Sequence, residues 1–258
     1  MTEQNYSGNF YKYQGTGNDF VMIDNRDGQF PVNQAYIEHL CHRRFGIGAD
    51  GLILLQNDPD YDFRMVYFNA DGREGSMCGN GGRCTVRFAE DLGIFNGSTN
   101  FIAIDGEHQA SADSAVISLK MGKVHSLEHN EYYDFMNTGS PHYVRYISDI
   151  QNFDVFNEGR KVRYAVDWVK RGGTNVNFVE VLDNETIYVR TYERGVEDET
   201  YSCGTGVTAC AISAYLKYGM QSPVKIITNG GNLQVSFDND FQNIYLTGPA
   251  VRVFEGKL

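Results

Sequence analysis

The sequence predicts an α/β chain, α+β in its arrangement, built from two related halves. Short apolar strands alternate with helix-like segments, and the pattern Cys-Gly-x-Gly occurs at both Cys78 and Cys203. A similar order of turns, strand, cysteine turn and helix surrounds both cysteines, which indicates an internal duplication with pseudo-twofold symmetry. The 258 residues suffice for two domains, expected at 1–137 and 138–258, with chain ends able to cross between them.

The first half begins with two predicted strands, Phe10–Tyr13 and Phe20–Ile23, joined by the polar turn Gly15–Asp19. A helix is predicted from about Pro31 to His42 because proline and asparagine mark its start. Further expectations for this half are strands at Leu52–Leu55 and Phe63–Phe68, paired strands across 100–124, and a helix after Cys78 that ends at Gly93.

The second half repeats parts of this order. Asn175–Val181 is similar to Asn18–Ile23, and the strand Ile187–Tyr192 ends in a polar turn, as Phe63–Phe68 does. An extra segment of about residues 26–60 accounts for the longer first half. The remaining expectations are an irregular stretch at His125–Thr138, a helix with loops across 146–163, a helix after Cys203 closed by Gly219, and strands around Val224–Thr228, Leu233–Phe237 and Asn243–Leu246.

Composition excludes several classes of protein. The net charge of −11 argues against a general nucleic-acid binder, which needs a concentrated positive surface. No segment approaches the roughly 18 consecutive apolar residues of a membrane span. Residues Met1–Asn5 have neither the basic start nor the apolar run of a signal peptide. We therefore expect a cytoplasmic protein without nucleic-acid or membrane partners.

The chain contains five cysteines, and an odd number without a signal peptide predicts thiols in a reducing compartment. Cys41, Cys84 and Cys210 lie in apolar surroundings and are expected to be small buried hydrophobes. No Cys-x2-Cys pair occurs, so no metal site is expected.

Cys78 and Cys203 differ from the other three because each precedes a Gly-x-Gly turn that runs into a helix. Unpaired backbone N–H groups and the helix dipole favour negative charge there. This environment lowers the pKa of a thiol, and the same N–H groups can hold a ligand carboxylate. Two related halves would also leave a ligand cleft between them, with one cysteine on each wall.

Two facing thiols can invert a carbon centre. One thiolate removes a proton from one face while the opposite thiol supplies a proton to the other face. Helix N-termini aimed at the carboxylate on that carbon would stabilise the charge that develops. Such a 1,1-proton transfer needs neither pyridoxal phosphate nor a metal. The alternative is that the two cysteines are structural or form a regulatory disulfide.

The sequence resembles the diaminopimelate epimerase family across nearly its whole length. The matching stretches are GTGNDFVMID (15–24), RRFGIGADGL (43–52), YFNADG (67–72), MCGNGGRC (77–84), PH (141–142), NVNFVEV (175–181), YERG (192–195) and CGTG (203–206). Each stretch is modest alone, but together and in this order they are highly specific.

The resemblance implies a cofactor-independent enzyme that interconverts L,L- and meso-2,6-diaminoheptanedioate, a small-molecule substrate on the route to lysine and peptidoglycan. It implies two similar domains, each a barrel-like, mostly antiparallel sheet around a central helix. Cys78 and Cys203 match the acid/base cysteines, and His142 and Glu193 match positions thought to tune their pKa values. The substrate-binding positions of the family match Asn18, Asn69, Gly79, Asn80, Asn175, Glu193, Arg194, Gly204 and Thr205. A homodimer is a further candidate from the family.

Glu193 and Arg194 suit a second amino-acid head, since a carboxylate pairs with an amine and a guanidinium grips a carboxylate by two hydrogen bonds. Two departures from the family bear on substrate affinity: Ser140 stands where asparagine is frequent, and the segment Val196–Tyr201 is longer. The basic run His42-Arg43-Arg44 is interpreted as structural rather than as a phosphate site.

Three alternatives stay open. Proline and hydroxyproline racemases share paired cysteines but carry histidine where this chain has Asn80. Phenazine-biosynthesis-like isomerases share the duplicated fold but lack the cysteine pair. From another class, a thiol redox sensor would pair Cys78 and Cys203 reversibly. Asn18 is a special case, because it could simply be a turn asparagine that tolerates a left-handed backbone.

Overall fold

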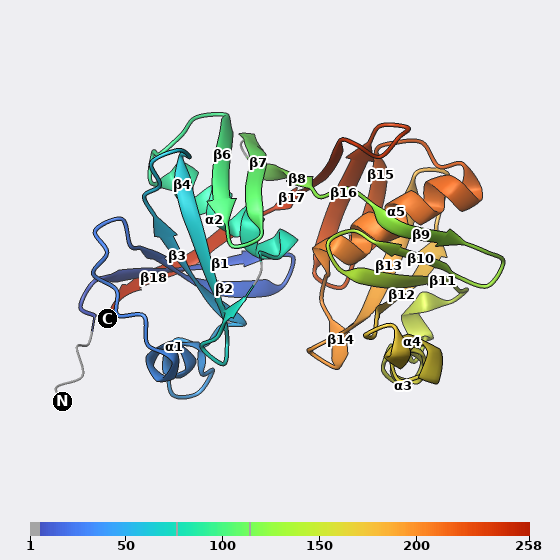
Figure 1. Cartoon of the computed structure of the whole chain (residues 1–258), viewed down its shortest axis with the longest axis horizontal. Helices are drawn as coiled ribbons and strands as arrows, with labels where there is room; N and C mark the ends of the chain where they lie inside the picture. The colour runs from blue at the N-terminus through green and yellow to red at the C-terminus, as the bar shows by residue number, and fades with distance from the viewer. Residues whose placement is uncertain (1–5, 76, 114) are drawn as a thin grey trace. The chain divides into compact units, whose positions relative to one another are not determined.

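The computed structural model describes residues 6–75, 77–113 and 115–258, and it consists of two compact units (Figure 1). The first unit contains the chain up to Leu119 together with the C-terminal Pro249–Leu258, and the second contains Lys120–Gly248. The boundary expected at 137 and 138 therefore falls inside the second unit. Backbone pairing explains this, because β9 (His125–His129) pairs with β10 (Asp134–Asn137), which in turn pairs with β11. The stretch expected to be irregular thus forms two strands.

The described residues of the first unit form a mixed sheet with two helices. Helix α1 is capped at its start by the Asn33 side chain, as predicted. Helix α2 follows Cys78. The elements of this unit are β1 (Asn9–Gly15), β2 (Asn18–Asp24), α1 (Gln34–Cys41), β3 (Gly51–Gln56), β4 (Phe63–Asn69), β5 (Glu74–Gly75), α2 (Gly79–Asp91), β6 (Ser98–Ala103), β7 (Gly106–Asp113), β8 (Val116–Met121) and the returning C-terminal strand β18 (Val251–Lys257). The last two residues of β8 belong to the second unit.

The second unit is also a mixed sheet, with its longest helix following Cys203. That helix ends at Gly219, whose φ of 70° is a left-handed conformation that glycine adopts without steric cost. Besides β9 and β10, the elements are β11 (Pro141–Tyr146), η1 (Ile150–Asn152), α3 (Val155–Arg163), α4 (Val166–Lys170), β12 (Asn175–Val181), β13 (Thr186–Glu193), β14 (Asp198–Thr200), α5 (Gly204–Tyr218), β15 (Val224–Thr228), β16 (Gly231–Phe237) and β17 (Ile244–Pro249).

Strand pairing confirms the predicted duplication. In the first unit, antiparallel β1–β2 is followed by parallel β2–β3, antiparallel β3–β4 and parallel β4–β6. The second unit repeats these pairings as β10–β11, β11–β12, β12–β13 and β13–β15. The short hairpin partners β5 and β14 also correspond, since each pairs antiparallel with the preceding strand.

The pairing also corrects the alignment of the two halves. Asn175–Val181 forms β12, which corresponds to β3 and not to β2, the strand that begins at Asn18. Helix α1 lies between β2 and β3, and η1, α3 and α4 lie between the corresponding strands β11 and β12. Both halves therefore carry helical segments at this place, so the extra segment predicted near residues 26–60 is not unique to the first half.

Each unit is built around its cysteine-led helix. Helix α2 contacts β1, β2, β3, β4, β7 and β18, and α5 contacts β10, β11, β12, β13, β15 and β16. Both helices are buried along most of their length, which is typical of a core helix rather than a surface one. The predicted fold class, with a sheet around a central helix in each half, is confirmed.

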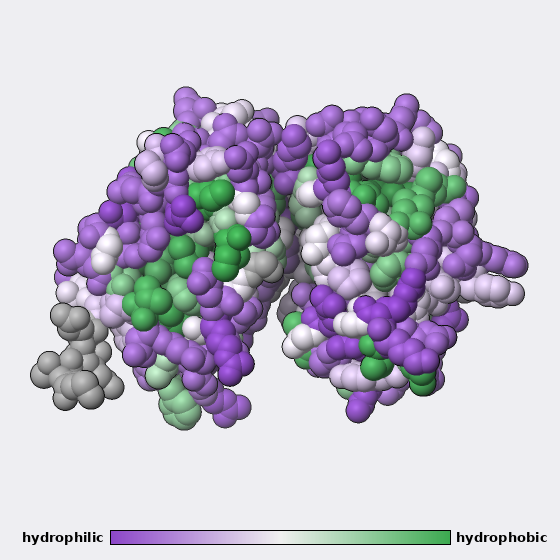
Figure 2. All heavy atoms as spheres, viewed as in Figure 1, coloured by the Kyte–Doolittle hydropathy of each residue, from purple (hydrophilic) through white to green (hydrophobic). Residues whose placement is uncertain are grey.

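On the face shown in Figure 2, hydrophilic residues surround hydrophobic patches in both units. No helix within the described part of the chain combines the length and apolar character needed to cross a membrane.

Candidate active site

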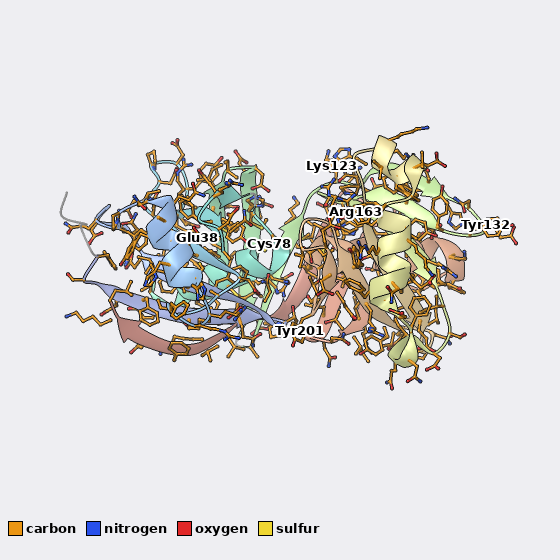
Figure 3. All side chains as sticks on the ribbon, turned by 90° about the horizontal axis from the view of Figure 1, so that it is seen from below. Glu38, Cys78, Lys123, Tyr132, Arg163 and Tyr201 are labelled. Carbon is orange, nitrogen blue, oxygen red and sulfur yellow. The ribbon has the colours of Figure 1, made fainter. Side chains whose placement is uncertain are left out.

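Cys78 caps the N-terminus of α2. Its backbone is extended, with φ −104° and ψ 151°, and its Sγ accepts a hydrogen bond from the Gly81 backbone N–H at 3.3 Å. The side chain is half-buried and is labelled in the first unit in Figure 3. The predicted placement of Cys78 at a helix start is therefore confirmed, and the sulfur lies where backbone donors favour negative charge.

Asn18 lies beside this cysteine turn, at the first residue of β2. Its side-chain oxygen accepts from the Cys78 thiol at 3.9 Å and from the Asn80 amide at 3.4 Å. Asn18 on β2 is thus brought to Cys78 and Asn80 at the start of α2, although it lies 60 and 62 residues away from them in the sequence.

Arg83, a residue not among those predicted for the site, lies fully buried beneath this turn. Its guanidinium donates to the Gly79 carbonyl at 3.2 Å, to Asn80 Oδ1 at 3.0 Å and to Thr16 Oγ1 at 3.1 Å. Burial lowers the pKa of Arg83 to about 10, so it keeps its charge at neutral pH. The signal in the sequence is a charged residue among the small residues that begin this helix, because a buried arginine must be hydrogen-bonded.

Asn69 ends β4 and is exposed. Its Oδ1 accepts from the Tyr67 hydroxyl at 3.1 Å, and its Nδ2 donates to the Arg73 carbonyl at 3.4 Å. Both partners lie in or beside the β4–β5 turn. These two hydrogen bonds therefore hold Asn69 to that turn, whereas those of Asn18 lead to the Cys78 turn.

In the second unit, Cys203 is the N-cap residue of α5 and is 8% exposed, and unlike Cys78 its side chain makes no capping hydrogen bond. Its Sγ lies 3.6 Å from Thr205 Oγ1, and that hydroxyl lies 2.8 Å from His142 Nε2. His142 comes from β11 and is fully buried. Burial, reinforced by the charge of Arg194, lowers the pKa of His142 to about 3, so the imidazole is neutral at neutral pH.

Asn177 sets the tautomer of His142. The Asn177 Nδ2 donates to the Tyr143 carbonyl at 2.9 Å, and its Oδ1 accepts from Thr191 Oγ1 at 2.9 Å. With the amide oriented in this way, Nδ2 also donates to His142 Nδ1 at 3.2 Å. A neutral imidazole that accepts at Nδ1 carries its proton on Nε2. His142 therefore donates to the Thr205 oxygen, which leaves the Thr205 O–H available to donate to Cys203 Sγ.

Asn175 and Arg194 are also brought together. Asn175 Oδ1 accepts from the Arg194 backbone N–H at 2.9 Å, and its Nδ2 donates to Ser140 Oγ at 2.8 Å and to the Pro141 carbonyl at 2.9 Å. Ser140, noted as a departure from the family, is thus a direct partner of Asn175. The Arg194 guanidinium is exposed and donates to the Gly172 carbonyl at 3.2 Å.

Glu193 ends β13 beside Arg194, and its Oε2 accepts from Thr200 Oγ1 at 2.8 Å. The segment after Arg194 returns as β14, so the longer 196–201 stretch forms a hairpin. Glu197 holds its tip by accepting from Arg163 on α3 at 3.0 Å and from the Gly195 N–H at 3.1 Å. Arg163 and Tyr201 are labelled in Figure 3.

The three remaining cysteines match their prediction. Cys41, Cys84 and Cys210 are buried thiols. Burial raises the pKa of Cys41 to about 12 and also raises those of Cys84 and Cys210. They are therefore packing residues. Among the described residues, no group of three or more His, Cys, Asp or Glu side chains could hold a metal ion.

Comparisons with known proteins identify the family of the chain. A family model described as "Diaminopimelate epimerase" matches residues 10–126 and 135–253. The diaminopimelate epimerase of Flavobacterium psychrophilum is 54% identical over 251 residues, which cover 95% of this chain and 98% of that protein. The diaminopimelate epimerase of Aquifex aeolicus is 40% identical over 272 residues, covering 96% of this chain and 97% of the relative.

Solved structures agree with the fold. A phenazine biosynthesis protein of the PhzF family from Bacillus anthracis has a TM-score of 0.78 at 12% identity, covering 98% of this chain and 99% of that one. A hydroxyproline epimerase from Agrobacterium vitis, with bound trans-4-hydroxy-L-proline, has a TM-score of 0.69 at 13% identity, covering 99% and 93%. At 12% and 13% identity, these two structures show similarity of fold alone. The family is shown by the family model and by the relatives of higher sequence identity. The chain belongs to the diaminopimelate epimerase family.

Proposed function

We propose that this protein interconverts L,L- and meso-2,6-diaminoheptanedioate by moving the proton on one α-carbon, with Cys78 and Cys203 as the acid/base pair. The observation that supports this reaction is the sequence identity to diaminopimelate epimerases over nearly the whole chain. The observation that supports the thiol mechanism is that each cysteine caps a buried helix, where a thiolate is favoured.

The proton transfer is balanced without an added reactant. One cysteine, as thiolate, takes the α-proton and becomes a thiol, while the other, as thiol, gives its proton to the opposite face and becomes a thiolate. The backbone N–H groups of Gly79 and Asn80 in one turn, and of Gly204 and Thr205 in the other, would hold the α-carboxylate. They would thereby stabilise the carbanion that forms between the two transfers.

The two units supply different further contacts. Asn18 and Asn69 would bind polar groups of the substrate in the first unit. Asn175 would do so in the second, where Arg194 would grip the distal carboxylate and Glu193 the distal ammonium. Two charged groups of opposite sign on adjacent residues match a second amino-acid head, which proline lacks.

We assign His142 and Thr205 to the tuning of Cys203. Neutral His142 donates to Thr205, so that the Thr205 hydroxyl can donate to the sulfur, and a donated hydrogen bond favours a thiolate over a thiol. Glu193 would have the opposite effect, because its negative charge favours the protonated thiol over the thiolate. The proposed reaction uses no cofactor and no metal.

Proton exchange tests the proposal. The wild-type protein, Cys78→Ala and Cys203→Ala would be incubated under reducing conditions with L,L-diaminopimelate in D2O, and deuterium and stereochemistry at the α-carbons followed by NMR and chiral chromatography. We expect deuterium at one α-carbon with wild type and loss of epimerisation in both variants. Epimerisation that survives either alanine substitution would contradict the two-thiol mechanism. Activity on proline but not diaminopimelate would overturn the substrate, and reversible oxidation without any exchange would favour a redox sensor.

The remaining expectations concern the protein's surroundings. We propose that it acts in the cytoplasm, on its small-molecule substrate and without nucleic acid, and that it forms a homodimer. Light scattering coupled to gel filtration measures the mass of the assembly, and a monomer at all accessible concentrations would contradict the dimer.

A further inference from the structure

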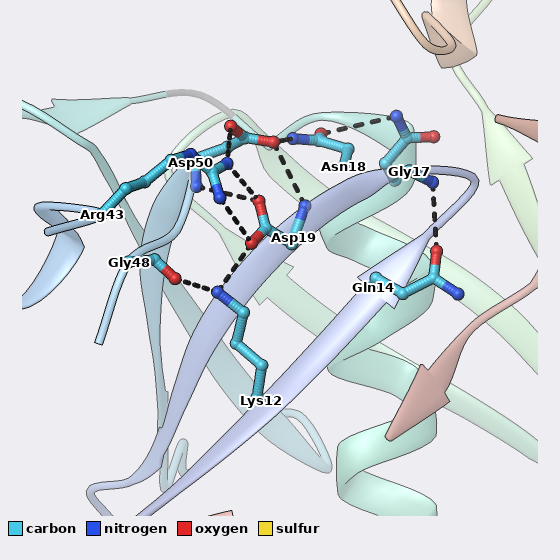
Figure 4. Close-up of polar contacts among 9 residues, drawn as sticks. Lys12, Gln14, Gly17, Asn18, Asp19, Arg43, Gly48 and Asp50 are labelled. Carbon is cyan, nitrogen blue, oxygen red and sulfur yellow. Dashed lines mark hydrogen bonds and ion pairs between the residues drawn. The ribbon is translucent and has the colours of Figure 1, made fainter. Parts of the chain in front are cut away.

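Four charged side chains form a cluster behind Asn18 in the first unit (Figure 4). Asp19 pairs with Lys12 at 2.7 Å and with Arg43 at 2.7 Å, and Arg43 also pairs with Asp50 at 2.7 Å. Lys12 lies on β1, Asp19 on β2, and the other two in the segment between α1 and β3. The proposed reaction does not use any of these charges.

The cluster is held firmly. Burial alone would raise the pKa of Asp19, but hydrogen bonds and charges from Arg43 and Lys12 lower it to about 2. Lys12 is 6% exposed and donates to the Gly48 carbonyl as well. The Asp50 backbone N–H donates to the Asp19 carbonyl at 2.9 Å, so the segment that carries Asp50 is attached to the β1–β2 hairpin by main chain and side chain together.

Asp50 determines which way the Asn18 amide faces. Its Oδ1 accepts from Arg43 at 2.7 Å, while its Oδ2 accepts from Asn18 Nδ2 at 2.6 Å and from the Asp19 N–H at 3.2 Å. A carboxylate can only accept hydrogen bonds, so the NH2 group of Asn18 must face Asp50. The Asn18 oxygen is consequently turned toward the cysteine turn, where it accepts from Cys78 and Asn80.

We propose that Asp50 is a positioning residue that keeps the carbonyl end of the Asn18 amide, rather than its NH2 end, toward the Cys78 sulfur. The inference rests on the proposed function of Cys78 as an acid/base group. A carbonyl oxygen beside the sulfur favours the protonated thiol, whereas an NH2 group there would favour the thiolate. Arg43 in turn positions Asp50 by donating a hydrogen bond to its other oxygen. Arg43 belongs to the His42-Arg43-Arg44 run, so at least this residue of the run has a structural role beside the site.

Two substitutions separate the amide orientation from the loss of charge. Asp50→Asn removes the charge but keeps an oxygen that can accept from Asn18 and the Asp19 N–H, with its own NH2 turned toward Arg43. Asp50→Ala removes the same charge and every acceptor, so the Asn18 amide is released. Because both variants lack the carboxylate charge, the difference between them reports the orientation of Asn18.

The first readout is activity. We expect kcat/KM to fall by on the order of tenfold to a hundredfold in Asp50→Ala, because a displaced positioning group costs rates of this size. In Asp50→Asn the loss should be several times smaller. In an Asn18→Ala background, Asp50→Ala should cause almost no additional loss, since the group it positions is gone. Equal losses in both Asp50 variants, or additive losses with Asn18→Ala, would overturn the proposal.

The second readout does not depend on activity. The rate of Cys78 alkylation by iodoacetamide, followed by peptide mass spectrometry across pH, reports the thiolate fraction. Its midpoint should move to lower pH in Asp50→Ala by more than in Asp50→Asn, and identical midpoints would contradict the inference. If the wild type proves inactive on diaminopimelate, the proposed function fails while this measurement still decides the role of Asp50.

Asp24→Ala is the matched control. Asp24 also lies on β2, pairs with an arginine, Arg26, at 2.7 Å, and stands at the opposite end of the strand from Asn18. It should leave kcat/KM and the Cys78 midpoint at their wild-type values. Urea unfolding of all variants identifies any loss of activity that results from a less stable fold. If activity falls in proportion to stability in the Asp50 and Asp24 variants alike, a positioning role for Asp50 is also contradicted.

Discussion

Cys78 and Cys203 begin helices at equivalent places in the two repeats, yet different polar groups surround their sulfur atoms. Cys78 accepts from a backbone N–H and lies near the carbonyl end of Asn18, above the buried cation of Arg83. Cys203 lies near the Thr205 hydroxyl, which a neutral, buried His142 supports. The duplicated backbone thus places the two thiols, whereas side chains from neighbouring strands give each thiol its own environment. Four sets of variants test whether the two environments differ in this way.

The largest expected effect concerns the fifth residue after each cysteine, which is Arg83 in α2 and Thr208 in α5. Arg83→Met should lower the free energy of unfolding by about 3 kcal/mol, because several buried acceptors lose their donor at once. Thr208→Val removes only one donor, to the Gly204 carbonyl at 2.9 Å, and should cost about 1 kcal/mol or less. Urea unfolding measures the loss of stability in both variants. Equal losses would show that the buried cation of Arg83 stabilises its helix no more than the Thr208 hydroxyl stabilises α5.

The third residue after each cysteine is a glycine, Gly81 or Gly206. A Cβ on Gly206 would lie 2.6 Å from Asn177 Oδ1 and 3.2 Å from His142 Cε1, while the nearest atom to one on Gly81 is Cys78 Sγ at 3.3 Å. Gly206→Ala should therefore destabilise by about 2 kcal/mol through overpacking. Gly81→Ala should cost less than about 1 kcal/mol, because alanine's higher helix propensity offsets the tighter contact. A reversed order in thermal or urea unfolding would contradict the rigid His142–Asn177 arrangement.

The Thr205 hydroxyl provides the third comparison. Thr205→Val keeps the shape but removes the donor to Cys203, so kcat should fall by on the order of tenfold, the size of one lost charge-assisted hydrogen bond. The pH midpoint of Cys203 alkylation should rise, while that of Cys78 should stay unchanged. Thr205→Ser should restore most of the activity because it restores the hydroxyl. Failure of this rescue would indicate that the methyl group, and not the hydroxyl, matters.

Near neutral pH, the smallest effect is the pH dependence contributed by His142. Its pKa falls from an ordinary 6.5 to about 3 in the folded protein. Between these values the unfolded chain binds a proton that the folded chain does not, so the free energy of unfolding falls as the pH decreases below about 6.5. The slope is at most about 1.4 kcal/mol per pH unit from this site. His142→Gln should show a shallower slope in urea unfolding from pH 7 to pH 4, and an unchanged slope would place the effect elsewhere.

Local sequence signals predicted the centre of each repeat. Cys78 and Cys203 both cap helices, as expected from a cysteine before a Gly-x-Gly turn, and Asn33 caps α1. Such features depend on residues a few positions apart, which share a helix turn wherever the rest of the chain goes. The burial of Cys41, Cys84 and Cys210 followed from their apolar neighbours for the same reason.

The alignment of the repeats needed the tertiary structure. Asn175–Val181 and Asn18–Ile23 have similar patterns, yet the hydrogen-bond ladders pair β12 as the counterpart of β3. Short strands with the same alternation can pair with several partners, so their pattern alone does not determine their neighbours. The observed domain boundary differs from the predicted one for the same reason. Strand β9 pairs with β10, which pairs with β11, so both strands belong to the second unit.

The family, the duplicated α/β architecture and the two cysteine turns are predictable from the amino-acid sequence, because they depend on local patterns and on the order of motifs. The contacts that orient each site residue are visible only in the folded chain. Asp50 meets Asn18, and His142 meets Thr205, across strands and helices distant in sequence. Hydrogen bonds require donor and acceptor within about 3 Å of each other, and a linear pattern does not specify which distant side chains will approach so closely.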